Sequence, residues 1–361
     1  MWPDNRLRDL LGLDIPIVQA PMAGASGSAM AAATSEAGGL GSLPCAMLGG
    51  SKIRAEFGAI RQCTNSPINI NFFAHTEPAL DSEREYAWRK RLRDYYIEYG
   101  LDPDAEASAV NRAPFDNAAC EIVEDLKPEV VSFHFGLPER AFIDRVKAVD
   151  CKIFCSATTV AEAEWLAERG CDVIIAQGYE AGGHRGLFLS EDVFAQVGTM
   201  ALVPQIVDAV DVPVIAAGGI TDGRGIAAAF ALGASGAQMG TAYLFTPESL
   251  ISDLHREALR NVRDDQTALT NLFSGRPARG IINRVIREVG PISDTAPAFP
   301  MAGGALAPLK AAAESQGSGD FTSLWSGQAA RLGREMGAGE LTRALEAETL
   351  DCIGKLSQGA G

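Results

Sequence analysis

The stretch KIFCSATTVAEAEWLAERGCDVIIAQ, residues 152–177, alternates a short apolar run, a helical segment and a second apolar run. Thr159 followed by Glu162 is typical of a capping box at the start of a helix, and Gly170 is typical of a helix end. The apolar positions between them fall on one helix face: Val160, Ala163, Leu166 and Ala167. The stretch therefore predicts a parallel β-α-β unit.

The same alternation recurs along most of the chain. A helical segment over 225–232 ends at Gly233 and leads into another apolar run, much as Gly170 precedes the run at 172–177. Eight apolar runs are predicted as strands: Pro16–Ala20, Gly39–Leu43, Ile68–Phe72, Val130–Phe135, Lys152–Ala157, Asp172–Gln177, Val212–Gly218 and Gly236–Thr241. Parallel strands alternating with helices predict an α/β fold, a TIM (β/α)8 barrel, whose reactive groups lie at the carboxyl ends of the strands.

Segments that break the alternation predict the other domains. Residues 73–129 are charged and aromatic, and we interpret them as an elaborated connection. An amphipathic stretch at 321–350 predicts a helix that returns to the barrel. Its apolar residues at helical spacing include Trp325, Ala329, Leu332 and Met336. The predicted division is a barrel domain over 1–245, a smaller, mainly helical substrate-capping domain over 246–317, and a C-terminal helix over 318–361 that returns to the barrel.

Composition and charge exclude several classes of protein. With 361 residues, 47% of them hydrophobic, the chain buries a large core, which excludes a disordered chain. A formal net charge of -15 argues against a nucleic-acid partner, which needs a basic face. The N-terminus resembles no signal sequence and no segment approaches about 18 uninterrupted apolar residues, so we expect a cytoplasmic protein without a membrane partner. The seven cysteines form no Cys-x-x-Cys pair, so no metal site is predicted.

A glycine-rich loop, QGYEAGGHRG at residues 177–186, directly follows the sixth predicted strand. It contains His184, one of only four histidines, and imidazole, with its unperturbed pKa of about 6.5, suits proton transfer near neutral pH. Glycines, which lack a Cβ, let a ligand approach the backbone closely. The loop therefore predicts an active site with His184 as a catalytic residue.

Loops after other predicted strands favour a bound mononucleotide. Gln19–Gly24 brings Pro21 and small residues to the end of the first strand, where they either hold a flat ligand or form an ordinary turn. Two later loops, Ala217–Gly223 and Gln238–Thr241, suit a phosphate, because barrels often bind phosphate there through backbone N–H groups. No G-x-G-x-x-G follows an early strand and no G-x-x-x-x-G-K-[ST] occurs, so neither a Rossmann dinucleotide site nor a P-loop is predicted.

Three more polar residues are candidates for this site, and two further histidines are expected to lie outside it. Asn69 and Asn71 share one face of the third strand, where their amides either reach a heterocycle at the barrel mouth or satisfy buried backbone groups. His134 ends the fourth strand and is either a substrate-facing residue or a hydrogen-bonded core histidine. We expect His75 to be structural. His255 lies in a charged helical segment, where we expect it to be solvated.

Taken together, the motifs resemble the nitronate monooxygenase family, formerly called 2-nitropropane dioxygenases, and in particular its first class. The segments that carry the resemblance are Gln19–Met22, Gly38–Gly41, Asn69–Phe72, Ser132–Gly136, Gln177–Gly186, Ala216–Gly225, Gln238–Ala242, Ser274–Arg276 and Trp325–Gln328. The resemblance implies an FMN-dependent TIM-barrel enzyme. It also implies a reaction in which a nitronate gives one electron to FMN. The flavin semiquinone and the substrate radical then react with O2 to yield a carbonyl compound and nitrite.

Carried over position by position, the resemblance implies which residues serve FMN and which serve the substrate. Asn71 and Gln177 are expected to hydrogen-bond the flavin ring, which lies against the loop after the first strand. The full set of predicted cofactor-binding residues is Ala20, Pro21, Met22, Asn69, Asn71, Gln177, Gly182, Gly183, Gly218, Gly219, Gln238, Met239, Gly240 and Thr241. His184 is the implied catalytic base, and His134 is the implied second catalytic residue, across the same pocket.

The chain departs from the family pattern around the substrate. Members of the first class carry a tyrosine- and lysine-bearing segment over the pocket, but residues 297–307 contain neither, and a tyrosine before the fourth strand is replaced near Phe115. These changes favour a larger or more apolar substrate than a small alkyl nitronate. Two alternatives stay open: an FMN-dependent NAD(P)H:quinone or enoyl-thioester reductase of the same barrel family, and a catalytically idle flavin-binding protein. The expected partners are a small-molecule substrate and O2, and the expected assembly is a monomer or homodimer.

Overall fold

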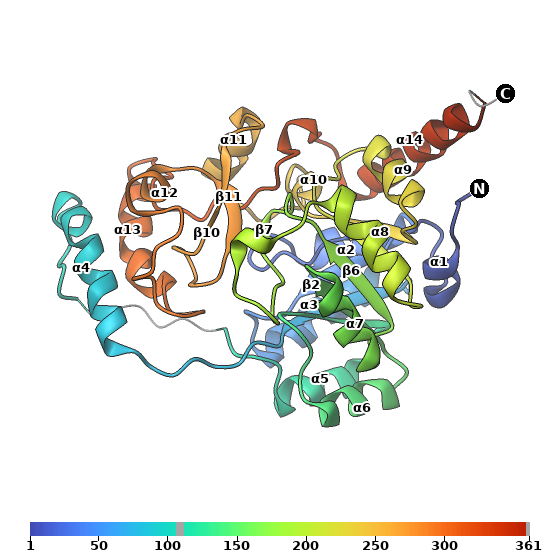
Figure 1. Cartoon of the computed structure of the whole chain (residues 1–361), viewed down its shortest axis with the longest axis horizontal. Helices are drawn as coiled ribbons and strands as arrows, with labels where there is room; N and C mark the ends of the chain where they lie inside the picture. The colour runs from blue at the N-terminus through green and yellow to red at the C-terminus, as the bar shows by residue number, and fades with distance from the viewer. Residues whose placement is uncertain (106–111, 359–361) are drawn as a thin grey trace.

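The computed structural model describes residues 1–105 and 112–358, and at its centre lies a barrel of eight parallel strands (Figure 1). The strands are β1 (Ile17–Gln19), β2 (Gly41–Pro44), β3 (Ile68–Phe73), β4 (Val130–His134), β5 (Lys152–Ala157), β6 (Val173–Gln177), β8 (Val214–Ala217) and β9 (Gly236–Met239). They pair in the order β1-β9-β8-β6-β5-β4-β3-β2, and a bridge between Val18 and Leu40 closes the barrel. The predicted TIM barrel is confirmed, with all eight strands at their predicted places.

Alternation along the strands separates the barrel interior from the layer of helices. On β6, Val173 and Ile175 pack inside the barrel, whereas Ile174 and Ala176 pack outward against the helices. Because side chains alternate with period two, Gln177 returns to the interior at the carboxyl end of the strand. At the opposite end, helix α1 (Arg6–Leu11) contributes Leu7 to the interior cluster. The cavity at the mouth therefore has a packed apolar floor.

A ring of helices covers the outside of the barrel. They are α2 (Ser28–Glu36), α3 (Gly50–Cys63), α5 (Asn117–Leu126), α6 (Arg140–Ala148), α7 (Val160–Glu168), α8 (Thr199–Ala209), α9 (Gly223–Ala231) and α14 (Ala338–Gln358). At the start of α7, the Thr159 hydroxyl oxygen accepts from the N–H of Glu162 at 3.2 Å, as predicted. The Glu162 carboxylate instead accepts from the N–H groups of Thr158 and Phe188, so only half of the predicted capping box forms.

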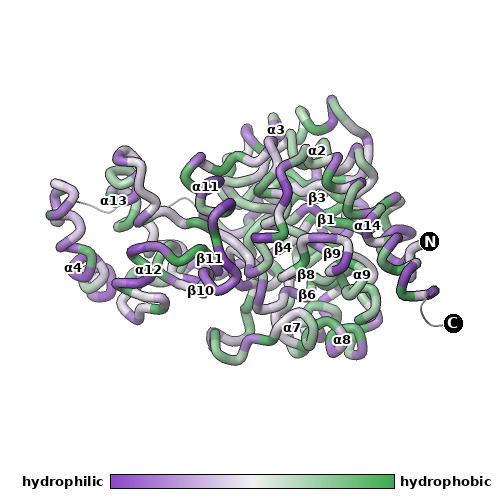
Figure 2. The backbone as a smooth tube through the Cα atoms, turned by 90° about the horizontal axis from the view of Figure 1, so that it is seen from above, coloured by the Kyte–Doolittle hydropathy of each residue, from purple (hydrophilic) through white to green (hydrophobic). Residues whose placement is uncertain are grey.

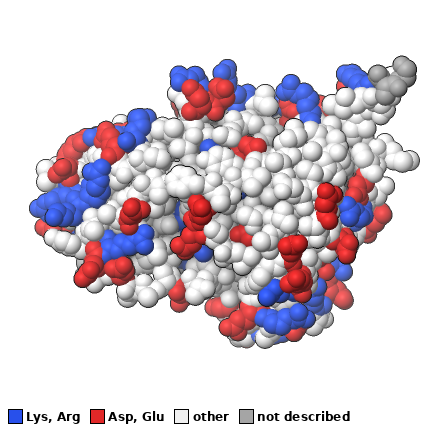
Figure 3. Space-filling view, viewed as in Figure 1, with Lys and Arg blue, Asp and Glu red and all other residues white. Residues whose placement is uncertain are grey.

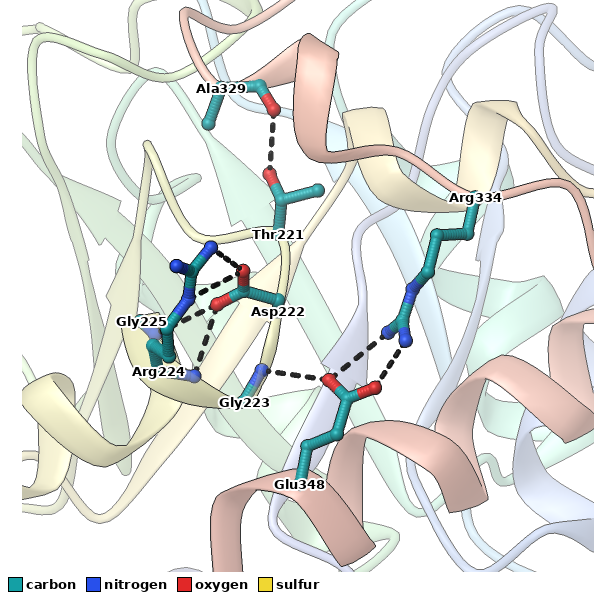
Figure 4. Close-up of polar contacts among 8 residues, drawn as sticks. All are labelled: Thr221, Asp222, Gly223, Arg224, Gly225, Ala329, Arg334 and Glu348. Atoms are coloured by element: carbon teal, nitrogen blue, oxygen red, sulfur yellow. Dashed lines mark hydrogen bonds and ion pairs between the residues drawn. The ribbon is translucent and has the colours of Figure 1, made fainter. Parts of the chain in front are cut away.

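The C-terminal helix completes this ring, as predicted. Helix α14 packs against both α9 and α2, and its Glu348 accepts from the N–H of Gly223 at 3.2 Å and pairs with Arg334 (Figure 4). Thr221, on the loop after β8, donates its hydroxyl proton to the carbonyl oxygen of Ala329 at 3.2 Å. The C-terminal segment therefore holds the loop after β8 from two sides.

The segment before α14 differs from the single helix predicted over 321–350. The long helix begins only at Ala338, and the preceding residues are irregular apart from one short turn, η2 (Ala330–Leu332). The backbone of Trp325 bridges Gly280, and Gly333 lies so close to the Phe245 ring that a Cβ has no room. These tertiary contacts override the helical spacing of the apolar residues.

The cap combines helices with a small antiparallel sheet. Its helices are α4 (Ser82–Glu98), α11 (Asp253–Asn261), α12 (Arg284–Val289) and α13 (Gly303–Ser315), and its strands pair in the order β10 (Thr267–Thr270), β11 (Ala278–Ile281) and β7 (Gly183–His184). Two short turns, α10 (Thr241–Leu244) and η1 (Val193–Ala195), lie on barrel loops. The strands were not predicted, because β7 and β11 are short and pair only across the cap.

Helix α4 belongs to the cap, although the predicted cap was confined to 246–317. The Trp88 indole on α4 donates to the carbonyl oxygen of Ala302 at 3.0 Å, and the Tyr96 hydroxyl donates to that of Ala305 at 2.6 Å. In two views, α4 and α13 lie together at the end of the molecule opposite both termini (Figures 1 and 2). The elaborated connection after β3 thus supplies one helix of the cap.

The surface carries charges of both signs. On the face shown in Figure 3, Lys and Arg are interspersed with Asp and Glu and do not gather into a broad basic patch. Among the described residues, no helix is both long enough and apolar enough to span a bilayer.

Candidate active site

A cavity of about 530 Å³ opens at the carboxyl ends of the barrel strands, beneath the cap. Of the residues predicted for the site, those that line it are Ala20, Pro21, Met22, Asn71, His134, Gln177, Gly182, Gly183, His184, Gly218, Gly219, Gln238, Gly240 and Thr241. Asn69 and Met239 do not line it. The cavity therefore brings together loops from six strands that are far apart in the sequence.

The positions of Asn69 and Met239 follow from strand geometry. Asn69 shares the inward face of β3 with Asn71 but lies two residues deeper, and its amide donates to the Ser42 hydroxyl at 3.0 Å. Met239 points outward into the core between barrel and helices. Period-two spacing placed Asn69 on the correct face of the strand. Spacing does not report depth within the barrel, and it is depth that separates Asn69 from the cavity.

The wall of the cavity presents polar side chains, and one of them has an atom that no described protein group satisfies. Gln238 reaches the cavity from β9, and among the described residues its buried Oε1 has no hydrogen-bond partner. The Asn71 amide donates to the Ser132 hydroxyl at 2.9 Å, which fixes its orientation at the cavity wall. Beside these groups, the loop Ala20–Met22 offers a surface of small and apolar atoms. This combination suits a planar heterocycle with hydrogen-bonding edges.

The loops after β8 and β9 suit an anionic tail on such a ligand. Gly218 and Gly219 have φ values of 111° and 71°, which side chains rarely adopt. Within the described chain, the N–H groups of Gly219 and Gly240 have no acceptor. The N–H of Gly327 donates to the Thr241 hydroxyl at 2.9 Å, so the C-terminal segment also reaches this end of the cavity. Sequence reasoning assigned no role to Gly327, although the segment 325–328 was part of the family resemblance.

His184 is anchored by the cap as well as by the barrel. It lies on β7, where it pairs with Ala278 of β11. Its Nε2 lies 2.8 Å from the Ser274 hydroxyl, which also donates to the carbonyl oxygen of Arg276 at 3.3 Å. This hydrogen bond fixes the orientation of the ring and leaves Nδ1 without a partner among the described residues. Aromatic rings surround the imidazole at centroid distances of 5.5 to 6.4 Å: Phe73, Phe135, Phe299 and Trp325.

His134 uses both ring nitrogens within the protein. Its Nε2 lies 3.2 Å from the carbonyl oxygen of His184, and its Nδ1 lies 3.1 Å from the Ser156 hydroxyl. Because a carbonyl only accepts, Nε2 of His134 donates and Nδ1 accepts from Ser156. Gln177 donates to the same His184 carbonyl at 2.9 Å and accepts from the N–H of Gly186 at 2.7 Å. His134 and Gln177 therefore fix the backbone that carries His184.

Both histidines are neutral near pH 7. Burial is the largest cause that holds the pKa of His184 well below its usual value, and Arg112, His134 and Arg276 lower it further. Burial likewise lowers the pKa of His134 to about 4. A neutral imidazole at the cavity can accept a proton or a hydrogen bond, but it supplies no positive charge.

Arg185, next to His184, is a structural residue that sequence reasoning did not assign. It is fully buried, and its guanidinium donates to the carbonyl oxygens of Gln177 and Gly178 and to the side chain of Gln196. Five donors in one planar group suit this task. Arg185 therefore closes the glycine-rich loop into a fixed shape around His184.

Two further arginines face the same aromatic cluster. The Arg112 guanidinium lies 5.7 Å from the Phe299 ring centroid and that of Arg276 lies 6.0 Å from it. Arg276 is also 4.4 Å from the Phe135 centroid and donates to the carbonyl oxygen of Leu187 at 2.8 Å. Among the described residues, neither guanidinium has a carboxylate within ion-pair distance. Arg112 therefore brings a positive charge to the cavity, whereas Arg276 lies against the aromatic rings and does not line it.

Two histidines outside the predicted catalytic pair also lie inside the fold. The prediction of a solvated His255 is wrong: it is buried, lines the cavity, and has Nε2 2.9 Å from the carbonyl oxygen of Trp325. It shares the inward face of α11 with Leu259, four residues on. His75 is buried against Phe299, and neither of its ring nitrogens has a partner in the described part of the chain.

Comparison with known proteins agrees with this geometry. The sequence profile of the family named nitronate monooxygenase matches residues 4–348. The chain belongs to the nitronate monooxygenase family. A nitronate monooxygenase from Pseudomonas aeruginosa is 42% identical to it over 346 residues, which are 95% of this chain and 99% of that relative. As a member of this family, the chain is a flavin-dependent oxidoreductase.

Solved structures of related proteins share the whole fold. A nitroalkane oxidase from Streptomyces ansochromogenes is 38% identical and superposes with a TM-score of 0.89 over 97% of this chain and 99% of its own. FabK from Thermotoga maritima is 26% identical, with a TM-score of 0.72 over 98% of each chain. Both solved structures thus share the fold over nearly the whole of this chain.

Proposed function

We propose that this enzyme binds FMN and oxidises nitronates with O2, yielding a carbonyl compound and nitrite. One observation carries the proposal. Neutral His184 and positively charged Arg112 line the same cavity, and among the described residues Arg112 has no carboxylate within ion-pair distance. A nitronate is a small organic anion, and such surroundings favour an anion over a neutral substrate.

FMN fits the groups that the protein leaves free. Ala20, Pro21 and Met22 would lie against the flavin ring, and Asn71 and Gln177 near its polar edges. Gln238 offers an acceptor without a partner among the described residues. Gly182, Gly183, Gly218, Gly219, Gly240 and Thr241 would hold the ribityl phosphate, for which the free N–H groups of Gly219 and Gly240 are suited. When bound, FMN supplies the one-electron redox chemistry between nitronate and O2.

His184 contributes a ring nitrogen, Nδ1, that has no hydrogen-bond partner among the described residues. Oxidation of a neutral nitroalkane begins with loss of a C–H proton to a base. A histidine with a strongly lowered pKa gives little driving force for that step, because general-base efficiency follows basicity. A nitronate has already lost the proton. We therefore expect nitronates to be better substrates than the corresponding nitroalkanes, and His184 to orient the substrate.

The experiment is a comparison of two electron donors on purified, FMN-loaded protein. Under anaerobic conditions, propionate 3-nitronate should change the flavin spectrum rapidly and NADPH should not. In air, the same nitronate should consume O2 and release nitrite. Rapid bleaching by NADPH alone would favour the reductase instead, and a yellow protein that consumes no O2 would indicate an idle flavin-binding protein.

A further inference from the structure

Arg112 is a charged side chain at the cavity without a recognisable structural task. It enters from the connection after β3 and lines the cavity. Its Nε and Nη1 atoms are buried, and among the described residues neither has a hydrogen-bond acceptor. Its one defined contact is with the face of Phe299, 5.7 Å from the ring centroid. By comparison, Arg276 donates to a backbone carbonyl and stacks on Phe135.

A buried guanidinium with unused donors is expensive for the fold. Burying a charge without partners destabilises a protein, so buried charges are normally paired. Stacking on an aromatic face recovers only a small part of that cost and leaves the in-plane N–H groups unused. Because Arg112 lines the cavity, an anionic ligand there is positioned to offset its charge.

The uncompensated charge specifies that ligand. A guanidinium matches two oxygens of a planar anion, and such two-pronged bonds are stronger than neutral ones. A nitronate group has this shape, as does a carboxylate. Arg112 and His184 both line the cavity, so the anion would lie near both of them.

We infer that Arg112 is the specificity-determining residue of the substrate pocket, binding a planar two-oxygen anion of the substrate through its guanidinium. The inference rests on the proposed function for the identity of the substrate but not for the anion site itself. It revises the expectation, drawn from the apolar segment 297–307, that the substrate is simply more apolar. Phe299 in that segment supports the arginine.

The test compares Arg112→Gln and Arg112→Lys with the parent enzyme on two nitronates, one with an alkyl chain and one with a chain that ends in a carboxylate. Arg112→Gln should raise KM about 10- to 100-fold, the usual effect of losing a charge-assisted hydrogen bond, and change kcat much less. Arg112→Lys keeps the positive charge but lacks the planar N–H groups of a guanidinium. Its KM should therefore lie between those of the parent and Arg112→Gln. Arg263→Gln is the matched control, because that arginine lies on the surface, paired with Asp265.

The two substrates distinguish the two sources of the anion. A loss on both nitronates means that Arg112 holds the nitronate group, and a loss only on the carboxylate-bearing one means that it holds the carboxylate. An unchanged KM for both, in folded and FMN-loaded Arg112→Gln, would overturn the inference.

A binding measurement separates this inference from the proposed function. Nitrate, a planar oxyanion, is titrated calorimetrically into FMN-loaded parent, Arg112→Gln and Arg112→Lys proteins. Nitrate affinity that falls at least tenfold in Arg112→Gln supports the anion site even if the parent oxidises no nitronate. Equal nitrate affinity in parent and Arg112→Gln contradicts it, whatever the enzyme's activity. If Arg112→Gln does not fold, Arg112→Lys decides by the same two measurements.

Discussion

The two nitrogens of the His184 ring have different surroundings, so replacing this side chain should affect the substrate without affecting FMN binding. Nε2 is bonded to Ser274, whereas Nδ1 faces the cavity. His184→Asn should lower kcat/KM for nitronates about 10- to 100-fold, because one hydrogen bond to a charged substrate is lost. FMN content should not change, since the residues predicted to hold FMN remain. Steady-state kinetics and the flavin absorbance of the purified variant check both parts, and full turnover with full FMN content would contradict the role.

His134 shows how a residue can be predicted at the right place with a different task. Sequence reasoning placed it at the mouth of the barrel, and it does line the cavity. Its two ring nitrogens are occupied by the His184 carbonyl and the Ser156 hydroxyl. We therefore propose that His134 positions His184 and takes no part in proton transfer.

Among the helices, α4 holds the cap in place although it lies between the barrel strands β3 and β4 in the sequence. Trp88 on α4 is almost fully buried and donates to the carbonyl of Ala302 at the start of α13. Trp88→Ala should cost about 3 to 5 kcal/mol, the usual effect of removing a large core side chain. KM for nitronates should rise as well, because α13 follows the segment that carries Phe299.

Chemical denaturation and steady-state kinetics measure these two effects. Tyr86→Ala is the matched control, because Tyr86 lies on the same helix with its side chain mostly exposed. It should change stability by less than about 0.5 kcal/mol. If Trp88→Ala is as stable as Tyr86→Ala, then α4 does not hold the cap.

The loop after β8 depends on a backbone conformation that only glycine adopts easily. Gly219 has a φ of 71°, and a Cβ placed there would lie 3.2 Å from Cβ of Glu180. Gly219→Ala should therefore strain the loop by about 1 to 2 kcal/mol and weaken FMN binding roughly tenfold. The dissociation constant of FMN, measured by fluorescence titration of the apoprotein, is the readout.

Gly58→Ala is the control for this change. Gly58 lies within α3 with no atom near the place of a Cβ, so alanine there should be neutral or slightly stabilising. Equal FMN affinity in Gly219→Ala and Gly58→Ala would show that the loop after β8 does not hold the phosphate.

For the whole molecule, the buried histidines link stability to pH. Burial, with the nearby charge of Arg276, lowers the pKa of His75 to about 4, and it lowers the pKa values of the other three as well. The unfolded chain binds protons on these residues below about pH 6.5. In the folded protein His75 and His134 bind them only near pH 4, and the pKa values of His184 and His255 also lie below the usual value. Stability should therefore fall as pH decreases from about 6.5 toward 4, with no contribution from these groups above 6.5.

His75→Leu tests this linkage, because leucine fills much of the space and does not titrate. Between pH 6.5 and pH 5, His75 should lower the free energy of unfolding of the parent by on the order of 2 kcal/mol. The variant should not show this decrease. Urea denaturation at pH 7 and pH 5 gives the free energy of unfolding for both proteins. The same decrease in parent and variant would assign the acid sensitivity to other groups.

The whole molecule also sets a contrast between net and local charge. The chain has a formal net charge of -15, yet Arg112 lines its cavity. Overall negative charge slows the approach of an anion, whereas the local arginine favours its binding once it arrives. Raising the ionic strength therefore acts on these two effects in opposite directions.

The sequence by itself determined the parts that depend on near neighbours in the chain. Alternating apolar residues set the eight strands, and the motifs around Gly182 and Gly218 indicated the loops at the barrel mouth. Local periodicity and turn chemistry arise from contacts within a few residues, so they are visible without the fold. The same local pattern misled at 321–350, where contacts of Trp325 and Gly333 outweigh helical spacing.

Only the tertiary structure decided what surrounds the substrate. Arg112, His184, Arg276 and Phe299 come from three separate segments, and they meet because the cap folds back over the barrel. The depth of Asn69, the burial of His255 and the use of both nitrogens of His134 likewise depend on distant residues. Burial, electrostatic potential and hydrogen-bond satisfaction are properties of the packed chain, so no local pattern reports them.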